Sequence, residues 1–212
     1  MSSIHTHAQR NTIRLQVRQS MVLKNLTESA WTELEPQLEI ADFGKSDLLV
    51  RQGHSAMEQF FILDGILKRV VSNAKGKEMI LRFAAETDMD TSYAAWRLGT
   101  PMPYSIVAVT KGRVAKLSMQ HWVEFLDCHA AVKAHFEYEV MSLMSEVMAH
   151  TITLHLLDAP GRLARFKRKH QDLFGRIPKK ELASYLNLTP ETLSRLKRRT
   201  SNSQIPPAKP GA

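Results

Sequence analysis

The sequence predicts an α+β protein with an N-terminal antiparallel β-roll (a double-stranded β-helix), a long helix and a small C-terminal helical domain. Three observations predict this order. Short apolar runs separated by glycine-containing turns fill residues 42–110, a helical pattern follows Gln120, and the positive charge is concentrated after Asp158. With 212 residues, of which 43% are hydrophobic, the chain is long and apolar enough to bury a core.

The first predicted domain, residues 1–126, combines a helical leader with the roll. Asn11–Leu38 carries apolar residues at three- and four-residue steps, which predicts helix. Short apolar runs then alternate with turns such as Asp64-Gly65 and Lys111-Gly112, a pattern typical of an antiparallel barrel or roll. The runs are Leu48–Val50, Phe60–Leu63, Ile66–Val71, Met79–Phe83, Tyr104–Val109 and Arg113–Leu117.

Residues 127–158 are predicted to form one long helix that joins two copies of the chain. One apolar stripe at alternating steps of three and four residues suits a two-helix contact, so we expect a homodimer. A second stripe could pack back on the roll, and an ordinary core helix buried on two sides is the alternative. The first stripe is Val140, Leu143, Val147, His150, Leu154 and Leu157, where His150 is expected to be packed rather than a pH switch; the second is Met141, Met144, Met148 and Ile152.

The charge distribution sets the end of the chain apart. Residues 159–212 hold 13 Lys and Arg against 3 Asp and Glu, a net charge of +10, whereas the rest of the chain sums to −2. A neutral body with a basic C-terminal module is the electrostatic footprint of a nucleic-acid binder, although a solvated basic face or a membrane-surface patch has the same charge. Asp158–Gly161 reads as a hinge before a domain at 159–200, and the Pro-rich tail at 201–212 is expected to be disordered.

Two short helices joined by a tight turn are predicted inside the basic domain. Lys179–Leu186 forms the first helix, and Asn187 is able to take the left-handed backbone conformation that the turn requires. Thr189 is a good N-cap and Pro190 a good first residue for the second helix. The pattern is that of a helix-turn-helix, whose second helix enters the major groove of DNA.

The outward residues of this motif suit distinct contacts with double-stranded DNA. Arg195 offers two donors to guanine, Glu191 accepts from cytosine, and Ser194 is a candidate for a neighbouring base. A surface ion pair between Glu191 and Arg195 is the alternative, and it is compatible with base reading. The residues expected to reach backbone phosphates are Lys179, Lys180, Thr189, Thr192, Arg198 and Arg199.

The order of leader, roll, long helix, hinge and helix-turn-helix resembles the Crp/Fnr superfamily of bacterial transcription regulators. Phe61–Lys68 looks like the family's sensor roll, and Glu181–Arg195 like its DNA-binding segment. Glu191, Ser194 and Arg195 match the Glu-x-x-Ser-Arg pattern of the Fnr branch. The resemblance implies a homodimer on a palindromic operator with TTGA-type half-sites, and RNA polymerase as a further candidate partner.

The sequence departs from the members of this family that bind cyclic AMP. Thr91-Ser92 stands where they have Gly-Glu, and Met102-Pro103 where they have Arg-Ser or Arg-Thr. A buried cyclic phosphate would then lack a charged partner unless Arg97 substituted, so we expect no cyclic AMP binding. Another effector is a second possibility, for a pocket lined by Thr91, Ser92, Tyr93, Trp96 and Arg97, although Tyr93 and Trp96 read more readily as core aromatics.

The composition argues against several other classes. Cys128 is the single cysteine, which excludes a disulfide framework and a cysteine-ligated cluster, and we expect no metal and no cofactor. No secretory signal and no apolar run long enough for a membrane are found, so a cytoplasmic protein is expected. No catalytic triad or phosphate loop stands out, and no enzyme activity is expected. The rival interpretation is a small-molecule sensor whose basic end contacts nucleic acid non-specifically or a protein partner.

Overall fold

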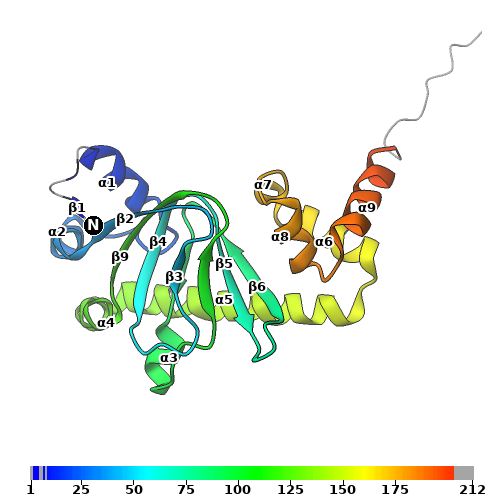
Figure 1. The fold of residues 1–212 in the computed structure, drawn as a ribbon. Helices are drawn as coiled ribbons and strands as arrows, with labels where there is room; N and C mark the ends of the chain where they lie inside the picture. Colours follow the sequence, from blue (N-terminus) through cyan, green and yellow to red (C-terminus); the bar gives the residue numbers. More distant parts are fainter. Residues whose placement is uncertain (1, 5–6, 8, 203–212) are drawn as a thin grey trace, which may run out of the picture. The chain divides into compact units, whose positions relative to one another are not determined.

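A computed structural model describes residues 2–4, 7 and 9–202 of the protein (Figure 1). The chain divides into two compact units, residues 1–149 and 150–212, which we call the roll unit and the C-terminal unit. The expected disordered tail lies outside the described residues beyond position 202. Within the described residues, no helix has both the length and the apolar character needed to cross a bilayer.

The leader of the roll unit consists of two helices rather than one continuous stretch. Helix α1 spans Arg10–Arg18 and α2 spans Glu28–Leu34, followed by the 3₁₀ turn η2 at Glu35–Gln37. The second helix starts afresh because Thr27 has an extended backbone and its hydroxyl accepts a hydrogen bond from the amide of Ala30 at 3.2 Å.

Two antiparallel sheets form the roll, in the strand orders β1-β2-β9-β4-β7 and β3-β8-β5-β6. The six predicted apolar runs all coincide with strands. The sequence analysis missed β1, β2 and β7. Strands β1 and β7 are only two and three residues long, and in β2 the apolar residues are interrupted by polar ones. The strands are β1 Ser2–Ser3, β2 Glu39–Phe43, β3 Leu48–Val50, β4 Glu58–Asp64, β5 Leu67–Ser72, β6 Glu78–Ala84, β7 Met89–Thr91, β8 Ser105–Ala108 and β9 Gly112–Ser118.

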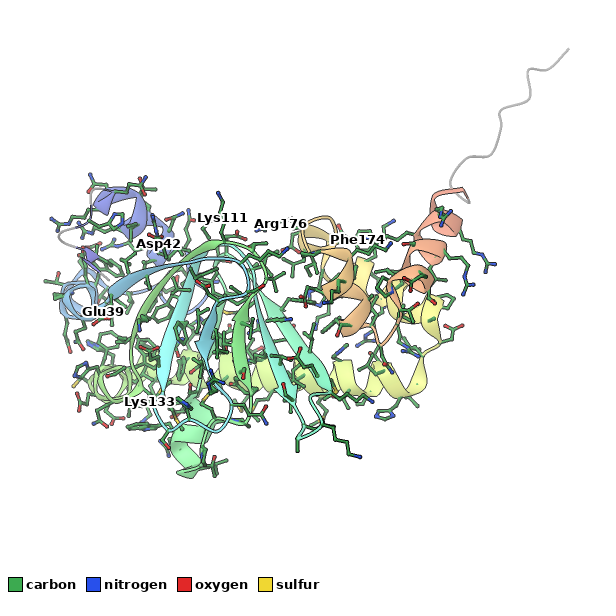
Figure 2. All side chains as sticks on the ribbon, viewed as in Figure 1. Glu39, Asp42, Lys111, Lys133, Phe174 and Arg176 are labelled. Atoms are coloured by element: carbon green, nitrogen blue, oxygen red, sulfur yellow. The ribbon has the colours of Figure 1, made fainter. Side chains whose placement is uncertain are left out.

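Strand β4 shows why the roll folds around two apolar clusters. Its residues from Gln59 to Leu63 are all buried. Alternate side chains point to opposite faces of the sheet, so both faces of this strand are covered. Phe60 and Ile62 pack between the two sheets with residues such as Leu67 and Ile106, in what we call the interior cluster. Phe61 and Leu63 pack on the other face, against the helices, in the outer cluster. Charged side chains such as Glu39, Asp42 and Lys111 lie outside both clusters (Figure 2).

Three further helices complete the secondary structure that surrounds the roll: α3 at Tyr93–Leu98, α4 at Met119–Cys128 and α5 at Ala130–Leu156. Helix α4 is capped by Ser118, whose hydroxyl accepts from the amide of His121 at 3.2 Å. Trp122 of α4 is fully buried in the outer cluster, where its ring meets Phe61 edge-on at 5.4 Å. The first half of α5 belongs to the same cluster through Phe136.

The two apolar stripes of α5 differ from the sequence prediction in which of them is buried. Val140 and Leu143 are buried in the outer cluster, and His150, the first residue of the C-terminal unit, is buried against Tyr185 of the same unit. The assignment of these three residues to a dimer seam is therefore wrong, because their own chain covers them; Val147 and Leu154, on the same side, are half-buried. The second stripe does not pack back on the roll: its residues Met141, Met144, Met148 and Ile152 are 49–66% exposed.

Within its described residues, the C-terminal unit contains the end of α5 followed only by helices. They are α6 at Ala159–Lys169, α7 at Gln171–Phe174, α8 at Lys179–Tyr185 and α9 at Pro190–Asn202. Helix α6 begins where the sequence predicts a break, since the Asp158 carboxylate accepts from the amide of Gly161 at 2.9 Å and caps it.

Candidate nucleic-acid interface

The turn between α8 and α9 has the local geometry that its residues predict. Asn187 adopts a left-handed conformation with φ of 51°. The hydroxyl of Thr189 then accepts from the amide of Thr192 at 3.2 Å, which caps the first turn of α9. The amide of Leu188 donates to the carbonyl of Ala183 at 2.9 Å and ties the turn back to α8. Two helices separated by this turn constitute a helix-turn-helix.

A small apolar core holds the two helices together. Leu182 of α8 and Leu193 of α9 are fully buried, and Ala183 is buried beside them, where its small side chain permits close approach. Leu186 is also buried, as the sequence predicts, while Leu196 is half-buried. The rest of this core comes from the preceding helices and the loop before α8, through Leu163, Phe166, Leu173 and Ile177.

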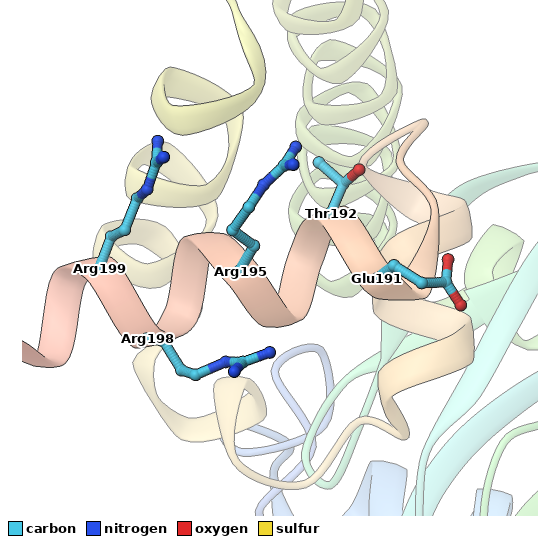
Figure 3. Close-up of a pocket in the computed structure, with 5 residues that line it drawn as sticks. All are labelled: Glu191, Thr192, Arg195, Arg198 and Arg199. Carbon is cyan, nitrogen blue, oxygen red and sulfur yellow. The ribbon is translucent and has the colours of Figure 1, made fainter.

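The outer side of α9 is strongly basic. Arg195, Arg198 and Arg199 are exposed, and together with Glu191 and the half-buried Thr192 they line a surface pocket. Figure 3 shows Arg195 and Arg199 projecting to the same side of the helix as Thr192, with Arg198 on another side. The guanidinium groups are therefore presented to solvent along more than one edge of the helix.

The ion pair between Glu191 and Arg195, which the sequence analysis gave as the alternative to base reading, does not form in the described part of the chain. The two side chains diverge (Figure 3). Instead, hydrogen bonds from its own amide and from the Thr189 hydroxyl, together with the nearby Lys179, lower the pKa of the Glu191 carboxyl. These contacts favour the carboxylate form of Glu191 at the start of α9.

Ser194 is less exposed than Glu191 and Arg195, the other two predicted base-reading residues of α9. It is half-buried, and its hydroxyl donates to the carbonyl of Pro190 one turn earlier at 2.9 Å. Because its proton is used within the helix, the Ser194 oxygen remains available only as an acceptor in this arrangement. The predicted phosphate contacts Lys179, Lys180 and Thr189 are all exposed near the start of α8 or α9.

Sequence reasoning missed two cations that act inside the C-terminal unit. Lys197 lies over the ring of Phe174, with its Nζ 4.4 Å from the ring centroid, and burial lowers its pKa. Arg162 of α6 donates to carbonyl oxygens at the end of α5 and in the turn before α9. In the sequence, both residues stand among many other basic residues. Nothing in the pattern distinguishes them from cations exposed on the surface.

The residues proposed as a ligand pocket fall into two groups. Tyr93 donates from its hydroxyl to Glu137 of α5 at 2.6 Å and packs edge-on against Phe136, while Trp96 packs on the same outer cluster. These two are core aromatics rather than pocket lining, because they face the helices and not the space between the sheets. Arg97 lies over the Tyr93 ring, its Cζ 5.8 Å from the centroid.

Thr91 and Ser92 are buried next to an ion pair that the sequence analysis did not foresee. Arg69 of β5 donates from Nε to Asp90 of β7 at 2.8 Å, and these side chains are 6% and 0% exposed. The Tyr104 ring covers the Arg69 guanidinium, with 4.6 Å between its centroid and Cζ. The Tyr104 hydroxyl donates to the carbonyl of Thr91 at 2.6 Å, and burial raises its pKa to about 12.

A second buried arginine lies on the adjacent strand. Arg82 of β6 donates to the carbonyl of Met89 at 3.1 Å and to the carboxylate of Asp88 at 3.3 Å. Two guanidinium groups that the sequence analysis did not identify are therefore buried in the roll. Both are already paired with carboxylates of their own chain.

These features define a two-part protein in which a β-roll of the cyclic nucleotide-binding type is followed by a long helix and a helix-turn-helix. Residues 41–129 match the family model of the cyclic nucleotide-binding domain. No curated protein sequence matches the chain. The comparison with solved structures confirms the predicted resemblance: the chain has the fold of the Crp/Fnr regulators.

Three of these structures illustrate the likeness, which at such low identities concerns the fold. FixK2 from Bradyrhizobium japonicum has a TM-score of 0.69 and 16% identity, over 82% of this chain and 89% of its own. The c-di-GMP responsive global regulator CLP of Xanthomonas campestris has a TM-score of 0.68 and 12% identity, over 86% and 96%. A CooA variant from Carboxydothermus hydrogenoformans has a TM-score of 0.68 and 16% identity, over 88% and 86%.

Proposed function

We propose that this protein is a transcription regulator that binds a palindromic DNA operator as a homodimer and does not require cyclic AMP. The observation that carries this proposal is the outer side of α9, where exposed arginines and a single carboxylate project from a capped and well-packed helix. The fold shared with Crp/Fnr regulators supports the same conclusion.

In this proposal α9 is the recognition helix that lies in the major groove. Arg195 donates two hydrogen bonds to guanine, Glu191 accepts from the amino group of cytosine, and Ser194 accepts from a neighbouring base. The remaining polar residues set the register by binding phosphates. They are Lys179, Lys180, Thr189, Thr192, Arg198 and Arg199.

The homodimer in this proposal forms through the exposed stripe of α5 rather than through the stripe first predicted. Met141, Met144, Met148 and Ile152 recur at steps of three and four residues, as a two-helix contact requires. Adjacent exposed residues Tyr138 and Leu156 extend the apolar stripe along α5. An apolar surface of this length on one helix is favourably covered by the same stripe of a second copy.

A charge introduced into that stripe tests the dimer. Met148→Glu is expected to shift the protein towards monomer, because a buried carboxylate without a partner opposes association. The measurement is sedimentation velocity over a concentration series, with Met148→Leu as the control that keeps the stripe apolar. A variant Met148→Glu that sediments as the wild type does would contradict this interface.

The interior of the roll supports independence from cyclic AMP. A cyclic phosphate next to Thr91 would compete with Asp90 for Arg69, and displacing Asp90 would leave a fully buried carboxylate without its counter-charge. Arg82 on β6 is likewise already paired, with Asp88, although that carboxylate is 29% exposed and its displacement would cost less.

Fluorescence anisotropy with two duplexes tests the proposed function. One duplex carries TTGAT-N4-ATCAA and the other a scrambled sequence, each in a salt series with and without cyclic AMP. We expect the palindrome to bind more tightly without nucleotide. A requirement for cyclic AMP would overturn our interpretation of the roll. Equal binding to both duplexes, falling steeply with salt, would leave only non-specific attraction to phosphates.

A further inference from the structure

Arg162 joins three segments of the C-terminal unit through one guanidinium. Its Nε donates to the carbonyl of Leu157, just after the last residue of α5, at 2.9 Å. Its Nη1 donates to the carbonyls of Leu186 and Asn187, in the turn before α9, at 2.8 and 3.3 Å. Arg162 itself lies in the first turn of α6, where its amide donates to the carbonyl of Asp158. The end of α5 and the turn of the helix-turn-helix are thus held by the same side chain.

The chemistry of these carbonyls explains why an arginine is suited to the position. The last carbonyls of a helix have no partner within it, and both α5 and α8 end here. A guanidinium offers several donors in one rigid plane, so it satisfies the ends of two helices together. Its positive charge also lies where helix carbonyls point, which is favourable. A lysine ammonium carries the same charge without the planar, forked arrangement of donors.

The surroundings leave this contact little freedom. Gly161 is so close to its cap that an added Cβ would lie 2.9 Å from the Asp158 carboxylate oxygen. Tyr185, the residue before Leu186, is the last residue of α8. Its ring stacks on His150 of α5 with 3.7 Å between ring centroids and 3° between ring planes. Tyr185 also meets Phe166 of α6 edge-on at 5.5 Å. Two neighbouring contacts therefore attach the end of α8 to the end of α5: the stack of Tyr185 on His150 and the hydrogen bonds of Arg162.

We infer that Arg162 is a positioning residue that sets the spacing between the two DNA half-sites. This inference rests on the proposed function. Helix α9 begins three residues after Asn187, and α5 carries the proposed dimer stripe. Fixing the turn to the end of α5 fixes each recognition helix relative to Ile152 and Leu156, the part of the proposed dimer stripe that lies in the same unit. The distance between recognition helices then determines which half-site spacing the dimer accepts.

A spacer series measures this effect in the full-length protein. Duplexes with two TTGAT half-sites separated by four base pairs, or by one pair fewer or more, are compared with a duplex that has a single half-site. We expect the wild type to prefer one spacing by about tenfold. Arg162→Gln should reduce that preference to about twofold and leave single half-site binding almost unchanged. Arg162→Lys should resemble Arg162→Gln, because the fork rather than the charge makes the contact.

Arg168→Gln is the matched control, since it removes the same charge from an exposed position on α6. If Arg168 contacts phosphates, its loss weakens all duplexes alike and leaves the spacing preference intact. An Arg162→Gln protein that keeps the wild-type spacing preference would overturn the inference, as would an equal loss on every duplex including the single half-site.

Hydrogen exchange of the DNA-free protein separates this inference from the proposed function. We expect Arg162→Gln to accelerate exchange in residues 186–189, where the amide of Leu188 bonds to Ala183, without affecting the strands of the roll. A wild type that binds both duplexes equally refutes sequence-specific regulation, but accelerated exchange in the variant would still show that Arg162 holds the turn. Unchanged exchange would refute the positioning role itself.

Discussion

The roll unit and the C-terminal unit use arginine in opposite ways. Arg69 and Arg82 are buried in the roll, and each donates to a carboxylate of its own chain. Arg195 and Arg198 are exposed on α9, where no carboxylate of the described residues forms an ion pair with them. A buried and paired cation contributes to the structure of one chain, whereas exposed cations clustered on one helix attract an anionic partner.

The largest expected effect comes from breaking the buried pair. Asp90→Asn leaves the Arg69 guanidinium buried without its counter-charge, so we expect a loss of about 3–5 kcal/mol in the free energy of unfolding. Urea denaturation followed by tryptophan fluorescence measures it, because Trp31, Trp96 and Trp122 all belong to the roll unit.

Two further variants serve as a control for Asp90→Asn and as a substitute for it in case it does not fold. Asp42→Asn removes a carboxylate that pairs with Arg113 at the surface, where it is 67% exposed, and should cost much less. If Asp90→Asn does not fold, the double variant Arg69→Met with Asp90→Leu removes both charges and should recover most of the stability. Equal losses for Asp90→Asn and Asp42→Asn would mean that burial does not distinguish the two pairs.

An intermediate effect is expected from the exposed arginines. Arg195→Ala should weaken binding to the palindrome by about 1–3 kcal/mol and hardly change binding to the scrambled duplex. Lys180→Ala, at the start of α8, should instead weaken both duplexes alike and lower the salt slope by about one. Anisotropy titrations compare the two variants directly. A uniform loss for Arg195→Ala would assign this residue to phosphates rather than to bases.

The smallest expected effect is a pH dependence of the C-terminal unit. Burial, followed by the positive charges of His170, Lys169 and Arg165, lowers the pKa of His150 from 6.5 to about 4. The unfolded chain then binds the proton more readily, so stability is complete above about pH 6.5 and decreases as the pH falls towards 4. Between pH 7 and pH 5 this amounts to at most about 2 kcal/mol.

Hydrogen exchange in residues 150–202 follows this loss, since the C-terminal unit contains no tryptophan. His150→Phe keeps an aromatic ring against Tyr185 but cannot titrate, and its stability should depend less on pH. A variant with the full pH dependence of the wild type would assign the effect to other groups.

Short-range features of the fold were predictable from the sequence. The turn at Asn187, the cap at Thr189 and the apolar runs of the roll depend on the conformational preferences of single residues and on a period of two along a strand. The two faces of α5 were not predictable in the same way. Both stripes are apolar and share the helical period, so periodicity finds them but does not indicate which one its own chain covers.

By itself, then, the sequence determined the order of the elements, the helix-turn-helix and the basic character of the C-terminal unit, because these follow from local spacing and composition. Only the tertiary structure decided that Asp90 neutralises Arg69, that the methionine stripe stays exposed, and that Arg162 bonds to both Leu157 and Leu186. Each of these depends on residues distant in sequence meeting in space. The residue type alone does not indicate whether an arginine is buried or exposed, because its burial depends on the segments that pack around it.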